Sequence, residues 1–297
     1  MTIALQAERS GVLAGDTRSG GRDAFGYAAT RDHPPSAALS LHGVSLSFGG
    51  VVALSDIDLE VKRGEIRAII GPNGAGKSSI INVISGVYRP DRGHVSIGGQ
   101  RFASVPTQKL ARLGIARTFQ NLALFKGLTV LENVITGRGY RSRASFVEQM
   151  IGFGRAAREQ ADARDRAAAV LDFLHLDAFG DRLAGTLPYG LQKRVELARA
   201  LVAEPDLLLL DEPMAGMTAT EKNEMAGYVR SARDTFGTTV VLIEHDIGVV
   251  MGLSDHVAVL DYGRKIADGT PADVAADQRV IDAYLGVAPQ NEDGEGI

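Results

Sequence analysis

The chain contains no cysteine and no tryptophan among its 297 residues. Without cysteine, neither a disulfide framework nor a thiolate metal site is possible, and this fits a reducing compartment. Long apolar runs are also absent, because no stretch approaches the roughly 18 apolar residues that a membrane-spanning helix needs. The longest candidates are short, such as Thr239–Ile243. We therefore expect any membrane-spanning work to be done by other chains.

A strong charge of one sign is missing as well: there are 36 acidic and 32 basic residues, for a formal net charge of -4. This balance lacks the basic footprint by which proteins bind nucleic acid, so no nucleic-acid partner is expected. In contrast, 45% of the residues are hydrophobic, which is ample for a packed core.

The two ends of the chain differ in composition from the rest. Residues 1–36 are rich in glycine, serine, alanine, aspartate and arginine, and Glu8 and Arg9 interrupt their apolar stretch. We expect a disordered extension there and no secretory signal. Residues 287–297 are polar and predict a flexible tail. The region 38–286 is left as the folded domain.

A glycine-rich segment, GPNGAGKS at residues 71–78, carries the strongest chemical signal. An apolar strand-like run, Ile66–Ile70, precedes it, and helix-spaced isoleucines follow it over residues 78–85. In such a loop, backbone N–H groups surround phosphates, while Lys77 reaches the outer phosphates and the Ser78 hydroxyl contacts magnesium. The predicted nucleotide-binding residues of this loop are Gly71, Pro72, Asn73, Gly74, Ala75, Gly76, Lys77, Ser78 and Ser79.

Three further polar residues follow apolar strands. Asp211 and Glu212 come after the leucine run 207–210, and His245 comes after 240–243. A strand–helix–strand pattern places these residues at neighbouring strand ends, on the rim that holds the phosphate loop. There Asp211 can hold magnesium, through water, Glu212 can act as general base, and His245 can donate to the γ-phosphate.

The rest of the body contains two other kinds of pattern. Residues 39–61 alternate between apolar and polar side chains, which predicts an antiparallel β layer. Residues 127–190 have helical periodicity, with a capping box at Thr129 and Glu132. The predicted fold class is α/β: a P-loop NTPase with a RecA-like parallel core, an antiparallel β subdomain and an inserted α-helical subdomain over about 127–190.

These motifs and several shorter ones resemble those of ATP-binding-cassette ATPases over about 39–286, and closely those of the ATP-binding subunit of branched-chain amino-acid-type importers. The likeness is carried by SFGG at 47–50, RTFQN at 117–121, LPYG at 187–190, LLLLDEP ending at Pro213, IEHD at 243–246 and MGLSD at 251–255. The closing GTP and AYLG segments, which begin at Gly269 and Ala283, add to it.

The resemblance implies further site residues. Phe48 is the aromatic residue that stacks on adenine, whereas the strand periodicity alone fits a core-facing side chain equally well. Gln120 ligates magnesium beside Ser78 and Asp211. Gly190 contacts the nucleotide bound to a second ATP-binding subunit, either an identical copy or a close paralogue. The cofactors implied are ATP and Mg²⁺. The partners implied are that second subunit, two membrane-spanning permease subunits and, indirectly, a solute-binding protein, with the chain peripheral at the cytoplasmic face of the inner or plasma membrane.

Two departures from the family pattern are present. Pro188 replaces the serine of the shared L-S-G-G-Q element, so neither a hydroxyl nor an N–H is available at that position. Because the helix after Gly190 still offers its N-terminal N–H groups to an anion, we expect activity to be retained. Thr218 stands where many cassettes carry aspartate, and its role as a helix cap with Glu221 is a sufficient explanation.

The predicted function is ATP hydrolysis that energises uptake of branched-chain amino acids or related small solutes. The alternatives are a soluble cassette ATPase of nucleic-acid repair or translation, an exporter ATPase, and a P-loop kinase, which would leave LPYG and His245 unexplained. The stretch between Lys77 and Gly190 is too short for a repair protein's coiled-coil arm, and one phosphate loop argues against a translation factor.

The apolar residues Leu122, Leu124 and Phe125 are either a permease-docking surface or core.

Overall fold

The computed structural model describes residues 37–118, 120, 122–139 and 154–285. The predicted extension over residues 1–36 and the tail over 287–297 lie outside these ranges, as do Phe119 and Asn121 of the RTFQN motif. Within the described ranges, no helix combines the length and the apolar character needed to cross a membrane.

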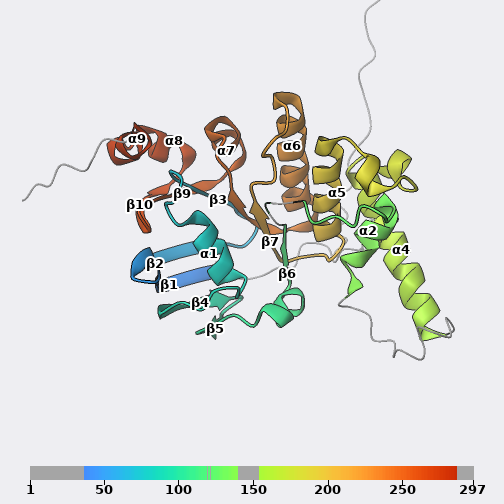
Figure 1. Ribbon diagram of the computed structural model, residues 1–297, viewed down its shortest axis with the longest axis horizontal. Coiled ribbons are helices and arrows are strands. Elements are labelled where there is room, and N and C mark those ends of the chain that lie inside the picture. Colours follow the sequence, from blue (N-terminus) through green and yellow to red (C-terminus); the bar gives the residue numbers. More distant parts are fainter. Residues whose placement is uncertain (1–36, 119, 121, 140–153, 286–297) are drawn as a thin grey trace, which may run out of the picture.

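A six-stranded sheet forms the centre of the molecule, with strand order β10-β9-β3-β8-β7-β6 (Figure 1). All neighbouring strands are parallel except β10, which pairs antiparallel with β9. Every residue of β3, β7 and β8 is buried, as expected of parallel strands covered on both faces. The strands are β3 (Ile66–Ile70), β6 (Ile115–Arg117), β7 (Leu207–Asp211), β8 (Thr239–Ile243), β9 (His256–Asp261) and β10 (Arg264–Gly269).

A second sheet is antiparallel, as the alternation over 39–61 predicts, with strand order β2-β1-β4-β5. Its strands are β1 (Ala37–Phe48), β2 (Val51–Lys62), β4 (Arg92–Ile97) and β5 (Gln100–Phe102). Helix α1 (Lys77–Ile84) lies between the two sheets, and its isoleucines share one core with the inner faces of both. This packing holds the phosphate loop, which precedes α1, against both sheets.

Helices gather on the other side of β7 (Figure 1). They are α2 (Val130–Thr136), α4 (Arg155–Phe173), α5 (Tyr189–Leu201) and α6 (Ala219–Phe236). All four share one core with the outer face of the central sheet, and a helix-spaced stripe of Ala167, Val170, Leu171 and Leu174 is buried in it. Helix α5 begins at Tyr189, close to the predicted boundary at about 190, which stays a prediction.

The remaining elements cover the far edge of the sheet and the connections. Helices α7 (Ile247–Leu253), α8 (Pro271–Ala276) and α9 (Gln278–Leu285) flank β9 and β10, and the 3-10 turns are η1 (Thr107–Leu113), η3 (Asp177–Phe179) and η4 (Ala184–Thr186). The capping boxes predicted at the starts of α2 and α6 are both present. A third, formed by Thr270 and Asp273, starts α8.

Candidate functional site

The phosphate loop joins the end of β3 to the start of α1 and requires glycine at two positions. Gly71 has φ 147° and Gly76 has φ 102°. A Cβ atom at Gly71 would lie 2.1 Å from the Leu260 carbonyl oxygen, and one at Gly76 would lie 2.6 Å from that of Ala53. The loop backbone therefore lies directly on β9 and β2, which leaves its inner N–H groups to face a ligand.

Lys77 is the first residue of α1, and its side chain bends back over the loop. Its Nζ donates hydrogen bonds to the carbonyl oxygens of Gly71, at 2.7 Å, and Pro72, at 2.8 Å. Burial lowers the pKa of the ammonium group, and the charge of Glu212 acts in the opposite direction. The ammonium group thus lies at the mouth of the loop, where phosphate oxygens would compete for it. Ser78 follows in the first turn of α1, and its side chain is exposed.

Asp211 ends β7 and is 4% exposed. Its Oδ2 atom lies 3.1 Å from Nη2 of Arg117, and its buried Oδ1 atom has no hydrogen-bond partner among the described residues. Burial raises the pKa of this carboxyl, while the Arg117 guanidinium acts against the rise. A buried anionic oxygen beside a phosphate loop fits a hydrated divalent cation, because carboxylate oxygens are ligands that magnesium prefers.

Arg117 was predicted only as part of the RTFQN motif, with no role of its own. In the structure it contacts several side chains. Besides Asp211 it donates to Oδ1 of Asn82, at 2.9 Å, and to Oγ of Ser85, at 2.6 Å. It therefore connects the carboxyl end of α1 to the carboxyl end of β7. The parallel pairing of β6 with β7 brings Arg117 to this position. The sequence alone does not show which strand pairs with β6, so it does not predict the contact between Arg117 and Asp211.

Gln120, Glu212 and His245 meet at the same rim. The Glu212 Oε2 atom accepts from Gln120 Nε2 at 3.0 Å, and its Oε1 atom lies 2.7 Å from His245 Nε2. Glu212 has φ 49°, a conformation that residues other than glycine rarely adopt and that costs about 1–3 kcal/mol. Its N–H donates to the Ile243 carbonyl at 2.9 Å, which holds this turn. The structure thus brings the three predicted residues together around one carboxylate.

Glu244 supports this arrangement, although no sequence pattern assigns it a role. Its buried carboxylate accepts from the N–H of Met214 at 2.7 Å and from that of His245 at 3.2 Å. Burial raises the pKa of Glu244, and these two N–H groups lower it. The side chain therefore links the loop after Glu212 to the loop that carries His245.

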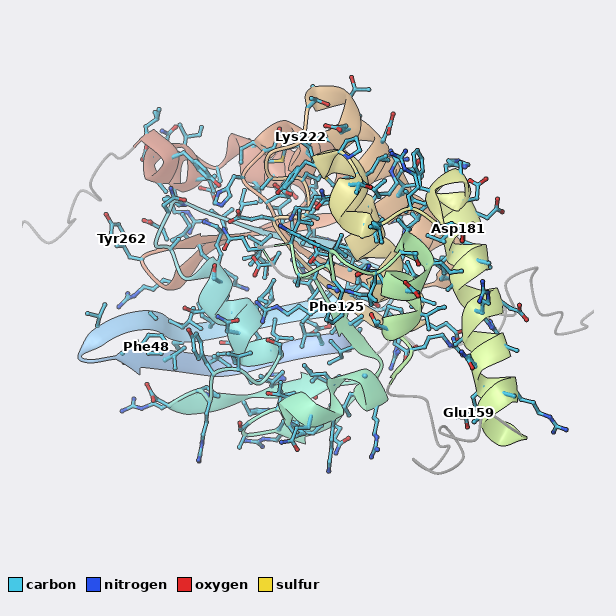
Figure 2. All side chains as sticks on the ribbon, turned by 45° about the vertical axis from the view of Figure 1, so that its right-hand side comes forward. Phe48, Phe125, Glu159, Asp181, Lys222 and Tyr262 are labelled. Carbon is cyan, nitrogen blue, oxygen red and sulfur yellow. The ribbon has the colours of Figure 1, made fainter. Side chains whose placement is uncertain are left out.

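Phe48 lies at the tip of the β1–β2 hairpin, and its side chain is 46% exposed (Figure 2). It is edge-on to Tyr88, with ring centroids 5.0 Å apart. Of the two possibilities for this residue, core packing and an exposed ring, the structure has the exposed ring. The hairpin adjoins the phosphate loop, because Ala53 and Leu54 of β2 contact Gly76.

The LPYG turn lies at the start of α5, away from the phosphate loop of its own chain, since Figure 1 shows α5 and α1 on opposite sides of β7. Pro188 is the N-cap of α5, so the helix begins at Tyr189 and not after Gly190 as predicted. A Cβ atom on Gly190 would lie 2.1 Å from Oε1 of Glu221. Glu221 also forms the capping box with Thr218. The turn is therefore packed on the start of α6.

A parallel sheet whose strand ends carry a phosphate loop, its lysine and a buried aspartate defines the class of ATP-binding P-loop ATPases. Comparison with known families agrees: residues 54–215 match the ABC transporter family, and residues 264–289 match the family described as branched-chain amino acid ATP-binding cassette transporter. The chain belongs to the ABC transporter family, whose ATP-binding cassettes bind and hydrolyse ATP. The predicted fold class and family resemblance are confirmed.

Individual relatives share most of the chain. The high-affinity branched-chain amino acid transport ATP-binding protein BraF of Pseudomonas aeruginosa is 38% identical over 250 residues, covering 84% of this chain and 98% of BraF. LivG of Escherichia coli has the same identity and coverage. LivG of Archaeoglobus fulgidus is 35% identical over 249 residues, covering 84% and 95%.

Solved structures give the same result. An ATP-binding cassette of an ABC transporter in its ADP conformation has a TM-score of 0.74 and 32% identity, covering 84% of this chain and 99% of that one. A dimeric cassette with ADP and phosphate has a TM-score of 0.66 and 26% identity, covering 78% and 98%.

Proposed function

We propose that the chain is the ATP-hydrolysing subunit of an importer that takes up branched-chain amino acids or closely related small solutes. The observation that carries hydrolysis is the Glu212 carboxylate, held between Gln120 and His245 at the rim beside the phosphate loop. The solute class is supported by the match of residues 264–289 and by the names of the relatives.

The chain's own residues suit MgATP. The buried Oδ1 of Asp211, which has no hydrogen-bond partner within the described ranges, fits a metal-bound water. The Ser78 hydroxyl and the amide oxygen of Gln120 would complete the protein's contribution. When bound, magnesium would neutralise charge on the β- and γ-phosphate oxygens. Lys77 would move from its two carbonyls to the phosphates, and Phe48 would stack on the adenine ring, a contact worth about 1–3 kcal/mol by analogy with base stacking.

Glu212 would align the attacking water and accept its proton. Its turned backbone and the hydrogen bond from Gln120 Nε2 hold the carboxylate in place in advance, which reduces the reorganisation needed at the moment of reaction. His245 would then donate to a γ-phosphate oxygen, and departure of that phosphate would free the imidazole to return to Glu212. The residues at the strand ends thereby sense the state of the nucleotide.

A second ATP-binding subunit, identical or closely related, would complete the pocket through its LPYG turn. Gly190 lies in the first turn of α5, whose N–H groups and dipole favour an anion such as the partner's γ-phosphate. The dimeric cassette among the similar structures supports this arrangement. Two permease subunits and a solute-binding protein would complete the importer, with this chain peripheral at the cytoplasmic face of the membrane.

Phe125 is the best candidate for contact with a permease. Its side chain is 55% exposed beside α2 (Figure 2), and its backbone is fixed by Asn133, which accepts from the Phe125 N–H at 2.9 Å and donates to its carbonyl at 3.0 Å. Leu124 is partly buried against the helical core, and Leu122 is half-buried. Of the three apolar residues, Phe125 alone presents a large exposed surface, whereas Leu124 packs against the core.

This difference allows a matched pair of variants. We expect Phe125→Glu to spare ATP binding and thermal stability but to uncouple hydrolysis from uptake, because it places a charge on the docking face. Leu124→Glu should instead lower the melting temperature, because it places a charge at a partly buried position that packs against the helical core. The measurements are thermal melts of the chain and solute uptake by the reconstituted complex. Uptake by Phe125→Glu equal to wild type would exclude this docking site.

The overall function is tested by purification of the complex. We expect the chain to co-purify with two membrane proteins, and its ATPase rate in proteoliposomes to rise when a solute-binding protein loaded with leucine, isoleucine or valine is added. If nucleic acid stimulates the isolated chain instead, the repair or translation alternative is correct. Solute movement in the opposite direction would identify an exporter.

A further inference from the structure

The segment that carries Gln120 leaves the central sheet at Thr118, whose N–H donates to a carbonyl of β7 at 2.9 Å. Two carbonyls farther along the chain accept hydrogen bonds from helix α5. The Gln120 carbonyl accepts from Lys193 Nζ at 3.3 Å, and the Ala123 carbonyl accepts from Arg199 Nη1 at 2.6 Å. The segment is therefore held by the sheet on one side and by two cations of one helix on the other.

The two cations are linked by an acidic residue between them. The Glu196 carboxylate lies 3.8 Å from Lys193 Nζ and 3.9 Å from Arg199 Nη2, at the i, i+3 spacing that places side chains on one face of a helix. The Lys193 side chain is 1% exposed, and that of Glu196 is also buried. Burial lowers the pKa of Arg199, and Glu196 opposes this.

Burial of such charges needs a reason beyond space filling. A buried ammonium group is costly unless it is paired and hydrogen-bonded, and methionine or leucine would fill the same space without that cost. What the charged side chains supply is directional hydrogen bonding. Their N–H groups fix which backbone carbonyl lies at which point along α5, which an apolar contact does not do.

Helix α5 has the LPYG turn at its N-terminus, and Phe125 lies two positions beyond Ala123. We propose that Lys193 and Arg199, linked by Glu196, are positioning residues that make the backbone at Gln120 and at Ala123 move together with α5. The side chain of Gln120 is then set by the same helix that faces the partner's nucleotide. This inference rests on the proposed function for what the movement does, although the clamp itself can be tested without it.

The first experiment is a double-mutant cycle between Lys193→Met and Gln120→Ala in the complete transporter complex. Methionine keeps the apolar stem of lysine and removes the ammonium group. If Lys193 acts through Gln120, Lys193→Met should lower kcat with little change in KM for ATP, and should have little further effect once Gln120 is alanine. We expect non-additivity of about threefold or more in kcat. Additive effects would overturn the proposal.

Arg194→Met is the matched control. Arg194 neighbours Lys193 on the same helix, but it pairs with Glu224 of α6 at 2.5 Å and lies over the Tyr228 ring. We expect its effect on kcat to be additive with that of Gln120→Ala. Arg199→Met provides an independent second test, because it removes the other cation at a less deeply buried position; it decides the question if Lys193→Met fails to fold.

The second experiment uses the nucleotide-free chain and measures amide hydrogen exchange. Peptides covering residues 118–126 should exchange several-fold faster in Lys193→Met and Arg199→Met than in the wild type and in Arg194→Met, at matched distance from each melting temperature. Unchanged exchange would overturn the clamp. Because this measurement requires neither hydrolysis nor transport, a wild-type complex that failed to take up solute would contradict the proposed function alone.

Discussion

Glu212→Gln is expected to lower kcat for ATP hydrolysis by about 10²–10⁴-fold, the range typical of a lost general base, and to leave ATP binding intact. Glutamine keeps the shape and one acceptor oxygen of the side chain, so contact with either His245 or Gln120 survives, but an amide does not accept a proton from water. The expected result is therefore a chain that binds MgATP and accumulates in a nucleotide-bound, dimeric state.

The measurements are equilibrium nucleotide binding, steady-state phosphate release and sedimentation of the chain with and without MgATP. Glu224→Gln is a suitable control, because Glu224 is an exposed acid on α6 that pairs with Arg194 and lies outside the rim cluster. Its turnover should equal that of the wild type. If Glu212→Gln hydrolyses ATP at an unimpaired rate, Glu212 is not the base.

Gly190→Asp is expected to reduce hydrolysis by about 10²–10³-fold, the loss typical when donors to a developing negative charge are removed, while the isolated chain still binds ATP. The structure adds a steric reason to the electrostatic one. A Cβ atom at this position would lie 2.1 Å from the Glu221 carboxylate, so the turn must shift, and an aspartate would add a like charge beside it.

Two alanine variants separate these causes. Gly190→Ala introduces the collision without the charge, so a loss equal to that of Gly190→Asp would assign the effect to displacement of the turn. Gly227→Ala is the control, because a Cβ atom at this glycine of α6 meets nothing within 4 Å. It should leave phosphate release unchanged. Normal turnover by Gly190→Asp would mean that the LPYG turn does not take part in hydrolysis.

The sequence specified the positions of some site residues and left others open. The placement of the phosphate loop between β3 and α1, and of Asp211, Glu212 and His245 at the ends of β7 and β8, follows from the glycine spacing and the apolar strands, which are local patterns. The roles of these residues stay predictions. The exposure of Phe48 was left open because it is the last residue of β1, where the strand alternation ends. Leu122, Leu124 and Phe125 were left open because an irregular segment has no period that tells a core side chain from an exposed one.

Other residues had no local signal at all. Arg117 meets Asp211, and Lys193 meets the Gln120 carbonyl, across long separations in the sequence. Neither pairing follows from composition or periodicity, because each depends on which strand or helix becomes the neighbour of which. The buried lysine is an extreme case: on a helix surface a lysine is ordinarily solvated, and only the surrounding packing shows that this one is enclosed.

The sequence by itself determined the elements and their order along the chain, and with them the class of reaction, because hydrophobic period, glycine spacing and capping residues act within a few positions of one another. The tertiary structure alone decided the strand order β10-β9-β3-β8-β7-β6 and therefore the contacts across it. The physical reason is distance along the chain. Side chains such as Arg117 and Asp211 have no influence on each other until the parallel pairing of β6 with β7 has brought them together.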